Sequence, residues 1–436
     1  MILLKGGRVV DPKSGTDEVL DLVLDGAKIA GIGRFPESGG YESVVEAAGK
    51  IVAPGLIDVH VHFRDPGRTD REDVSTGSAA AARGGFTTVV CMANTDPPAD
   101  NPETLSLVLK KAARERIHVR SVACVSKGMR GRELTDMGAL AAAGACGFSD
   151  DGRPLVSSAL ALHAMQKCAE LKMPLSLHEE DPDLVGSSGV NRGKISEKLG
   201  VPGAPAVSES SLVARDCMLA LDTGAAVDIQ HVSSAASVQI IRLAKRMGAK
   251  VWAEATPHHF SLTEEAVARF GALAKVNPPL RTEADRAEII RGLQDGTLDL
   301  IASDHAPHTA AEKALPFPEA PSGMIGLETS LALGVTNLVR TGRLTMLRLI
   351  EKMSWNPARL YGLDGGCLAE GGPADLVVFD PAESWKVGPF VSKSANSPFL
   401  GQTLTGKVKY TVCAGRLVYR DEEKTGGRTF GDRTEK

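Results

Sequence analysis

The chain has 436 residues, 43% of them hydrophobic and 24% charged, so it can bury a large core and exceeds one average domain. Its formal net charge of −4 provides no basic field for nucleic acid, and no stretch approaches the ~20 apolar residues of a membrane-spanning helix. The 7 cysteines are never spaced as Cys-x-x-Cys, which is typical of reduced thiols. We therefore expect a cytoplasmic protein, without a nucleic-acid or membrane partner, that contains one large and one small domain.

Both ends of the chain read as short strands separated by turns. Near the N-terminus, strands are expected at residues 2–4, 8–10, 20–24, 27–32 and 50–52, with glycine-containing turns between them. The C-terminal part is similar, with strand patterns at residues 375–380 and 407–418. Because these segments flank one domain, residues 1–52 and 358–436 are expected to pair into one small β-sandwich domain.

The central part of the chain, residues 53–357, alternates apolar strands with alanine- and leucine-rich helices, the signature of βα units on a parallel sheet. Eight strands are expected, at residues 56–62, 87–94, 118–126, 145–150, 174–178, 226–232, 250–255 and 298–304. Helices are expected between them, at residues 79–83, 104–114, 157–171, 208–221, 237–247 and 284–293. This α/β pattern favours a closed, TIM-like (β/α)8 barrel, since an open doubly wound sheet would carry a Gly-x-Gly-x-x-Gly loop after its first strand.

Two histidines and an arginine end the first barrel strand. His60, His62 and Arg64 alternate along the chain, so their side chains share one face of the strand. Two imidazoles on one face form half of a site for Zn²⁺ or a similar divalent ion. The arginine beyond them suits an anionic substrate held beside that metal.

Four more strands end in metal-ligating residue types: Asp150 and Asp151 on the fourth, His178 on the fifth, His231 on the sixth and Asp304 on the eighth. The catalytic groups of a barrel come from these strand ends. Six ligands exceed the needs of one tetrahedral ion, so we expect two ions that share a strand-four aspartate and a hydroxide. His60, His62 and Asp304 would hold one ion, and His178 and His231 the other. Strand alternation does not choose between Asp150 and Asp151.

These motifs resemble, over almost the whole chain, the cyclic amidohydrolases of the amidohydrolase superfamily, and among them the bacterial class I dihydroorotases. Hydantoinases and allantoinases carry a carboxylated lysine on strand four, whereas this chain has Gly147-Phe148-Ser149-Asp150-Asp151-Gly152 there. Class I dihydroorotases use an aspartate at that place, and the spacing to His178 matches the family if Asp151 is the ligand. The resemblance therefore implies two Zn²⁺ ions per chain, bridged by Asp151 and a hydroxide, with Asp150 as the open alternative.

The resemblance also implies the substrate contacts. Dihydroorotate carries a ring carboxylate that dihydrouracil, hydantoin and allantoin lack, and Arg64 is the cation that would hold it. Asn94 and His308 would join Arg64 on this carboxylate, and Asn277 would read the ring amide. The complete set implied for substrate binding is His62, Arg64, Asn94, Asn277, His308, Ser322 and Gly323.

The implied reaction is the reversible cyclisation of N-carbamoyl-L-aspartate to (S)-dihydroorotate and water, the third step of de novo pyrimidine biosynthesis. Asp304 is the implied catalytic residue, which passes the hydroxide's proton to the leaving ring nitrogen. One alternative is a hydantoinase, dihydropyrimidinase or allantoinase, against which Arg64 and the missing lysine argue. Another is a non-catalytic scaffold for aspartate transcarbamoylase, against which the retained ligands argue. A homodimer and a complex with that transcarbamoylase are both compatible with catalysis.

Overall fold

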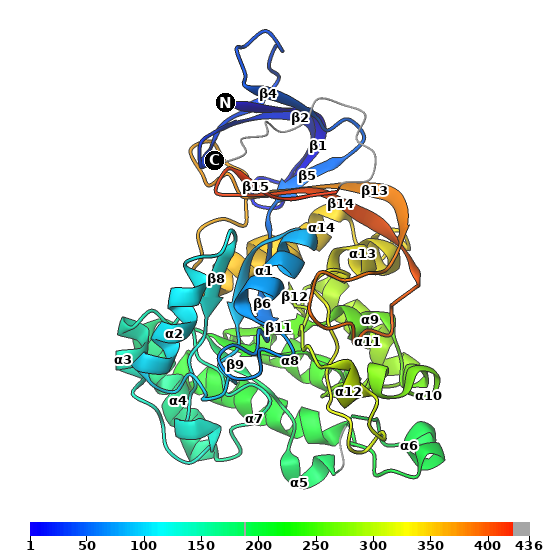
Figure 1. Ribbon diagram of the computed structural model, residues 1–436. Helices are drawn as coiled ribbons and strands as arrows, with labels where there is room; N and C mark the ends of the chain where they lie inside the picture. The colour runs from blue at the N-terminus through cyan, green and yellow to red at the C-terminus, as the bar shows by residue number, and fades with distance from the viewer. Residues whose placement is uncertain (187–188, 422–436) are drawn as a thin grey trace.

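A small β domain and a larger barrel lie end to end in the computed structural model, which describes residues 1–186 and 189–421 (Figure 1). The two ends of the chain form one eight-stranded sheet in the order β15-β14-β13-β5-β1-β2-β3, with β4 paired to β1. Its strands are β1 (Ile2–Asp11), β2 (Thr16–Asp25), β3 (Lys28–Gly33), β4 (Ser43–Glu46), β5 (Ile51–Pro54), β13 (Leu376–Lys386), β14 (Thr403–Cys413) and β15 (Arg416–Arg420).

Strand β5 joins the two ends of the chain, because it pairs parallel with β1 and antiparallel with β13. Leu22 and Leu24 from the N-terminal strands share one buried cluster with Val378 and Val412 from the C-terminal strands. The predicted sandwich is thus built from a single sheet that folds over its own core. Residues 422–436, part of the predicted domain, lie outside the described residues.

Parallel strands form the barrel in two hydrogen-bonded groups: β6 (Leu56–Val61), β7 (Phe86–Cys91) and β8 (His118–Ser121), then β9 (Leu175–Leu177), β10 (Val227–Ile229), β11 (Val251–Ala255) and β12 (Leu300–Ile301). On one side, Phe148 bridges to both Ala123 and Leu175, and on the other Val61 bridges to His305. The ring is therefore closed, and the predicted (β/α)8 class is confirmed.

The predicted fourth strand, residues 145–150, is reduced to the two bridges of Phe148. Gly147 has no side chain to pack, which weakens a strand at that position. Pro174, its neighbour on the next segment, has no N–H to donate to a ladder. The chain still passes through the ring at this point, so Asp150 and Asp151 follow Phe148 at the same end as the other strand ends.

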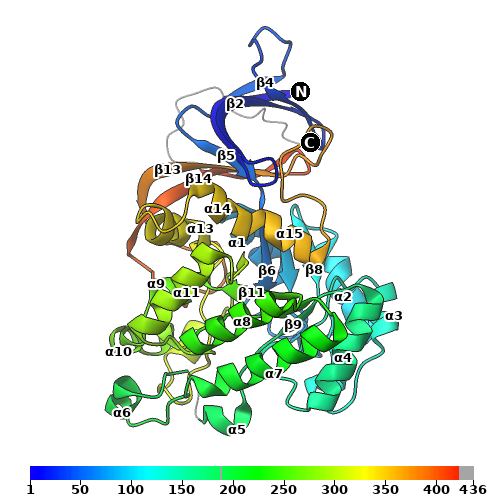
Figure 2. The same cartoon turned by 180° about the vertical axis from the view of Figure 1, so that it is seen from behind.

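Helices cover the outside of the barrel, and Figure 2 shows α4, α7 and α8 packed side by side there. The predicted helical runs correspond to α1 (Val74–Arg83), α2 (Pro102–Ala112), α4 (Ser158–Leu171), α7 (Val207–Thr223), α8 (Ala235–Met247) and α11 (Glu283–Asp295). Most begin at a side chain that accepts from a backbone N–H three residues on, as Asp73 does for α1 and Ser234 for α8. The shorter helices are α3 (Met137–Ala142), α5 (Pro182–Val185), α6 (Lys194–Leu199), α9 (Pro257–Ser261), α10 (Glu265–Phe270), α12 (Ala310–Lys313), α13 (Ser330–Gly334), α14 (Met346–Ile350) and α15 (Asn356–Tyr361).

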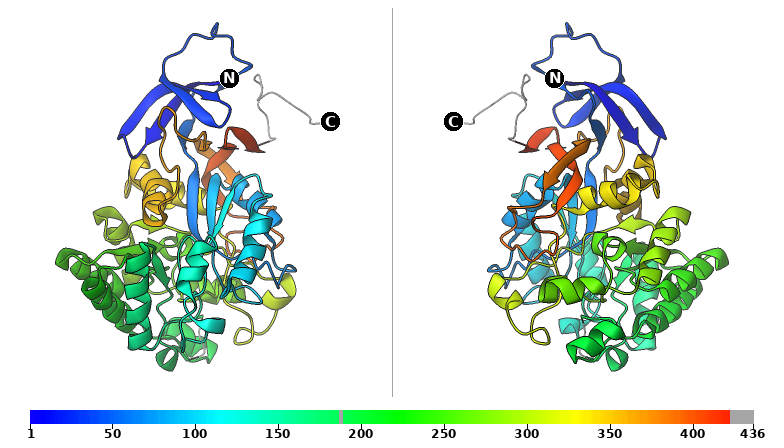
Figure 3. Two further views of the ribbon diagram at one scale, coloured as in Figure 1. Left: turned by 90° about the vertical axis from the view of Figure 1, so that its left-hand side faces the viewer. Right: turned by 90° about the vertical axis from the view of Figure 1, so that its right-hand side faces the viewer.

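The β domain marks the N-terminal end of the barrel strands, because only Gly55 separates β5 from β6 (Figure 3). The C-terminal strand ends therefore point away from that domain. Residues 387–402, between β13 and β14, run from the β domain down the side of the barrel (Figure 1). Within the described residues, no helix combines the length and the apolar character needed to cross a membrane.

Candidate metal centre and substrate site

The six predicted metal ligands converge at the C-terminal ends of the barrel strands. On one side, His62 Nε2 lies 3.3 Å from Asp151 Oδ2 and 3.1 Å from Asp304 Oδ1. His60 Nε2 lies 3.4 Å from Asp151 Oδ1 and 3.6 Å from Asp304 Oδ1. These four side chains are buried and face one point between β6 and the end of β12.

The other two imidazoles form a second group around the same aspartate. His178 Nδ1 and His231 Nε2 are 2.9 Å apart, and each lies 3.6 Å from Asp151 Oδ1. The ligand atoms within the group of His60, His62 and Asp151, and within that of Asp151, His178 and His231, all lie within 4.8 Å of one another. Asp151 is thus common to two groups that could each hold a metal ion.

Asp150 faces away from these groups. Its carboxylate accepts hydrogen bonds from the backbone N–H of Val125, at 2.8 Å, and from the backbone and hydroxyl of Ser126. Burial raises the pKa of Asp150 to about 6, although the Ser126 hydrogen bonds oppose that rise. The geometry therefore favours Asp151 over Asp150 as a shared ligand.

The donor set fits divalent metal ions. His60 Nε2 and Asp151 Oδ1 are buried and have no hydrogen-bond partner, although both point into the group. Buried polar atoms are nearly always satisfied, so two that converge on one point call for a cation. Four imidazoles with two carboxylates are a mixed nitrogen and oxygen set suited to zinc and neighbouring transition metals.

The charges of the centre are strongly coupled. Burial would raise the pKa of Asp151, but the imidazoles of His60 and His178 outweigh it and hold this pKa well below its usual range. Asp304 behaves alike, since His62 and His60 lower its pKa against the effect of burial. Both side chains are therefore carboxylates that can bind a cation.

Two carboxylates and one amide behind the metal groups orient the imidazoles. The two carboxylates were not predicted from the sequence. Glu254, on β11, lies 2.9 Å from His60 Nδ1, and Glu180 lies 3.1 Å from His178 Nε2. The amide oxygen of Asn94 lies 2.9 Å from His62 Nδ1. Such partners fix the tautomer and the direction of a ligating imidazole. The available signal for Glu254 was an acidic residue inside an otherwise apolar strand.

The backbone of the site adopts unusual conformations. Arg64, His231 and Asp304 have φ values of 58°, 37° and 47°, in the left-handed region that non-glycine residues rarely occupy. Such strain persists where the surroundings enforce it and is concentrated at functional sites. Each of the three residues lies two or three positions beyond the last residue of a barrel strand, at the strand mouth.

The predicted substrate residues surround this centre. Arg64 is half-buried, and its Nε is buried without a hydrogen-bond partner. Burial and the nearby Arg71 lower the pKa of Arg64 to about 10, so it remains a cation near neutral pH. Burial and Arg64 itself lower the pKa of His308 to about 3, so this imidazole is neutral.

His308, Ser322 and Asn277 form a connected set. His308 Nε2 donates to the backbone oxygen of Ser322 at 2.8 Å, and the Ser322 hydroxyl donates to Asn277 Oδ1 at 2.9 Å. Gly323 has a φ of 127°, and a Cβ there would stand 2.8 Å from Ala306 Cβ. Any larger residue at position 323 would push against the loop that carries His308.

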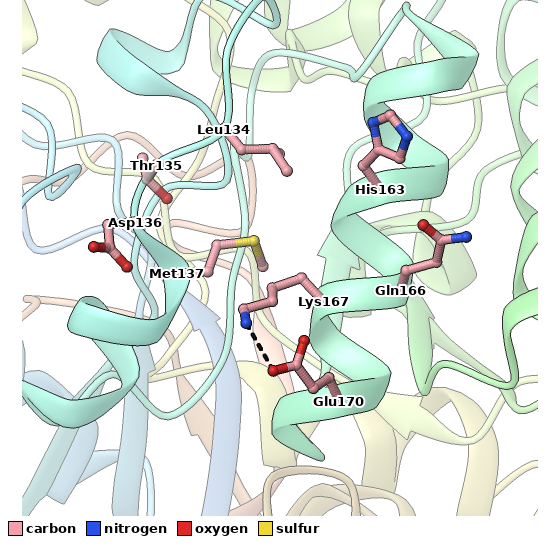
Figure 4. Close-up of a pocket in the computed structure, with 8 residues that line it drawn as sticks. All are labelled: Leu134, Thr135, Asp136, Met137, His163, Gln166, Lys167 and Glu170. Carbon is pink, nitrogen blue, oxygen red and sulfur yellow. Dashed lines mark hydrogen bonds and ion pairs between the residues drawn. The ribbon is translucent and has the colours of Figure 1, made fainter.

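A cavity of about 260 Å³ opens beside the metal groups and is lined by Asn94, Asp151 and Arg153, among others. A separate cavity of about 380 Å³ lies between α3 and α4, where Met137, His163 and Lys167 line it (Figure 4). No predicted site residue borders this second cavity. A third group of metal-ligating types, His118, Asp375 and Cys413, has its donor atoms already paired, because His118 Nε2 lies 3.0 Å from Asp375 and Cys413 Sγ lies 3.6 Å from the Thr87 oxygen.

The sequence is similar to those of known proteins. The family model described as "Dihydro-orotase-like" matches residues 49–237. Proteins named dihydroorotase from Clostridioides difficile and Lactococcus lactis subsp. lactis are 58% and 52% identical, over 96% of this chain and 100% and 99% of their own lengths.

Solved structures agree with the fold. An L-hydantoinase (dihydropyrimidinase) from Arthrobacter aurescens, 26% identical, superposes with a TM-score of 0.86 over 98% of both chains. A dihydropyrimidinase from Brevibacillus agri, 23% identical, superposes with a TM-score of 0.84 over 96% of this chain and 95% of its own. With more than half of its residues shared with full-length relatives of that name, the chain belongs to the dihydroorotase family.

Proposed function

We propose that this chain catalyses the reversible cyclisation of N-carbamoyl-L-aspartate to (S)-dihydroorotate and water, a step of pyrimidine biosynthesis. The observation that carries the proposal is the half-buried Arg64 cation, whose Nε is buried and unpaired, beside a group of imidazoles and carboxylates. A cation in this place calls for an anionic partner, and dihydroorotate brings a carboxylate on the same ring as its scissile amide.

His60, His62 and Asp304 are the proposed ligands of one zinc ion, and His178 and His231 those of a second, with Asp151 shared between the two. The shared position of Asp151, within 3.6 Å of four imidazole nitrogens, supports this assignment. When bound, such ions would polarise the scissile carbonyl and activate a water molecule. Glu254 and Glu180 keep His60 and His178 directed at the centre.

Arg64, Asn94 and His308 are the proposed partners of the substrate carboxylate. Arg64 supplies the charge, because its pKa of about 10 keeps it protonated, whereas the neutral His308 supplies a hydrogen bond. Asn277 would bind the ring amide, and the backbone at Ser322 and Gly323 would contact the ring. His62 stands between the two sets, since it contacts both Asn94 and Asp304.

Asp304 is the proposed proton carrier. In hydrolysis, water adds to the ring carbonyl, the carbon–nitrogen bond breaks, and Asp304 transfers the proton of the water to the leaving nitrogen. In cyclisation, the ureido nitrogen attacks the side-chain carboxyl carbon and gives its proton to Asp304. Asp304 passes this proton to the carboxyl oxygen that leaves as its carbon–oxygen bond breaks, and the resulting hydroxide becomes water with a proton from solvent. The lowered pKa of Asp304 keeps it ionised, as a proton acceptor must be.

The test compares ring opening by the metal-loaded protein on four substrates, namely dihydroorotate, dihydrouracil, hydantoin and allantoin, with metal per chain measured on the same samples. We expect dihydroorotate to be preferred in kcat/KM by a factor on the order of 100 or more, because an uncharged ring leaves Arg64 without a partner. Preference for an uncharged ring would instead support a hydantoinase-type activity and refute the role given to Arg64.

A homodimer and a complex with aspartate transcarbamoylase remain predictions from the sequence. Sedimentation of the chain alone, and mixed with that transcarbamoylase, would test both. A single monomer peak in each case would contradict them.

A further inference from the structure

The connection between β13 and β14, residues 387–402, reaches from the β domain to the loops at the C-terminal end of the barrel (Figure 1). We refer to these residues as the strap. Although the strap belongs to the C-terminal part of the chain, its polar side chains contact barrel loops more than 70 residues away in sequence. No role was predicted for the strap from the sequence.

Asn396 is the strap residue with the most connections. Its Oδ1 accepts from the backbone N–H of His308 at 3.1 Å. Its Nδ2 donates to the backbone oxygens of Ala306, at 3.0 Å, and Gly323, at 3.1 Å. Its own backbone oxygen accepts from the N–H of Ile325 at 3.1 Å. The residue is only 3% exposed, so one buried amide joins the loop after β12 to the segment that begins at Gly323.

We propose that Asn396 is a positioning residue that sets the distance between His308 and Gly323 and thereby shapes the binding site of the substrate carboxylate. The inference rests on the proposed function, because His308 and Gly323 have their roles there. The amide at the tip of an asparagine side chain offers an acceptor oxygen and two donor hydrogens, and all three are used here.

The rest of the strap holds Asn396 in place. The Ser392 hydroxyl and the backbone N–H of Lys393 donate to Glu72, and the Ser394 hydroxyl donates to the backbone oxygen of Arg71 at 2.8 Å. Glu72 also lies 3.3 Å from His305 Nε2. The strap is therefore fixed to the loop that follows Arg64 as well as to the loop that carries His308, so it links the two loops expected to hold the carboxylate.

The test uses the variant Asn396→Ala with Gln402→Ala as its matched control, because the Gln402 amide donates only within the strap, to the Pro398 oxygen at 2.8 Å. Kinetics of dihydroorotate ring opening by the metal-loaded full chain are measured for both, together with inhibition by orotate, which carries the same carboxylate. We expect Asn396→Ala to raise KM and the orotate inhibition constant on the order of tenfold, with kcat changed less than about threefold, because small displacements of binding groups weaken ligand contacts steeply.

The proposal would be overturned if KM and the orotate inhibition constant stayed within about twofold of the Gln402→Ala control. It would also be overturned if only kcat and the melting temperature fell. Should Asn396→Ala misfold, Asn396→Asp carries the test, because it keeps the size and the acceptor for His308 and loses both donors. Activity of the Gln402→Ala control on dihydroorotate tests the proposed function separately, so failure of the two ideas is distinguishable.

Discussion

At the scale of single residues, the adjacent aspartates of the fourth barrel segment have opposite surroundings. Asp151 contacts four imidazoles, whereas Asp150 accepts hydrogen bonds from Val125 and Ser126. We predict that Asp151→Asn lowers metal content and abolishes turnover with little change in fold. Asp150→Asn is expected to keep its metal but to lose ~1–3 kcal/mol of unfolding free energy, because its amide nitrogen would face backbone donors. Metal analysis and denaturant unfolding of both variants check this, and reversed outcomes would contradict the assignment of Asp151.

Arg64 is expected to lower the stability of the fold and to be required for substrate binding. The Nε of its half-buried guanidinium is buried and unpaired, and the adjacent His308 is kept neutral in part by its charge. We predict that Arg64→Met lowers kcat/KM for dihydroorotate on the order of 100-fold or more while raising the unfolding free energy by at most ~1 kcal/mol, since an apolar side chain replaces a half-buried charge whose Nε is unpaired. The pKa of His308 should rise in the same variant, which histidine NMR would detect.

A loss of stability together with an unchanged pKa of His308 would show that Arg64 has a partner inside the protein. Arg153→Met is a suitable control, because Arg153 lines the cavity beside the metal groups but donates to the Met129 oxygen only at 3.4 Å.

The sequence predicted the six converging ligands because each is a distinctive residue type at the end of an apolar strand. It could not choose between Asp150 and Asp151, since the strand whose alternation would decide is reduced to the bridges of Phe148. Glu254 and Asn396 were missed for a different reason. Their roles depend on partners about 194 and 88 residues away, and no local pattern marks such contacts.

At the scale of elements, most predicted helices and strands are found within a few residues, and the fourth barrel strand is one exception. Residues 2–4 and 8–10, predicted as two strands, form the single strand β1, and residues 407–418 are divided between β14 and β15. The periodicity of apolar residues determines these elements locally, which explains the agreement. The lengths of β13 and β14 and the course of the strap were not predictable in this way. In β13, the residues from Asp380 to Lys386 are half-buried or exposed, so no apolar pattern marks that part of the strand.

The short helix α12 offers a pH-dependent test at this scale. Glu312 accepts from the Thr309 backbone at 3.0 Å and pairs with Arg71 and Arg68. Burial opposes the shift, but the hydrogen bonds from Arg71 and Thr309 lower the pKa of Glu312 to about 2. A lowered folded-state pKa means that the carboxylate stabilises the fold above the unfolded value near 4.5, and that this stability is lost as the pH falls toward 2.

We therefore expect Glu312→Gln to unfold with ~0.5–1 kcal/mol less free energy at pH 7, a small value because these ion pairs are partly exposed. The difference from the unsubstituted protein should shrink as urea unfolding is repeated from pH 5 down to pH 3. Glu170→Gln, which removes an exposed ion pair with Lys167, serves as the control. A difference that persists or grows at acid pH would contradict the role of the carboxylate.

At the scale of the whole molecule, the proposed metal ligands lie on both groups of barrel strands. They come from β6, from the segment after Phe148, and from the ends of β9, β10 and β12, which belong to two separate hydrogen-bonded groups of strands. Backbone hydrogen bonds around Phe148 join the two groups on one side of the ring, and on the other side the N–H of His62 donates to the His305 oxygen. Metal ions at Asp151 would add a further connection between the two groups.

Removal of metal should consequently destabilise the whole barrel and not only abolish activity. Ions that bind the folded chain at ~1,000 times their Kd contribute ~4 kcal/mol, so we expect chelation to lower Tm by roughly 5–15 °C and zinc to restore it. Calorimetry of the metal-free and reloaded protein measures this shift. The Asp151→Asn variant should respond weakly to zinc, whereas His163→Ala, altered in the distant cavity between α3 and α4, should respond fully. Equal melting temperatures with and without metal would mean that the ions add no stability to the hydrogen bonds that already close the barrel.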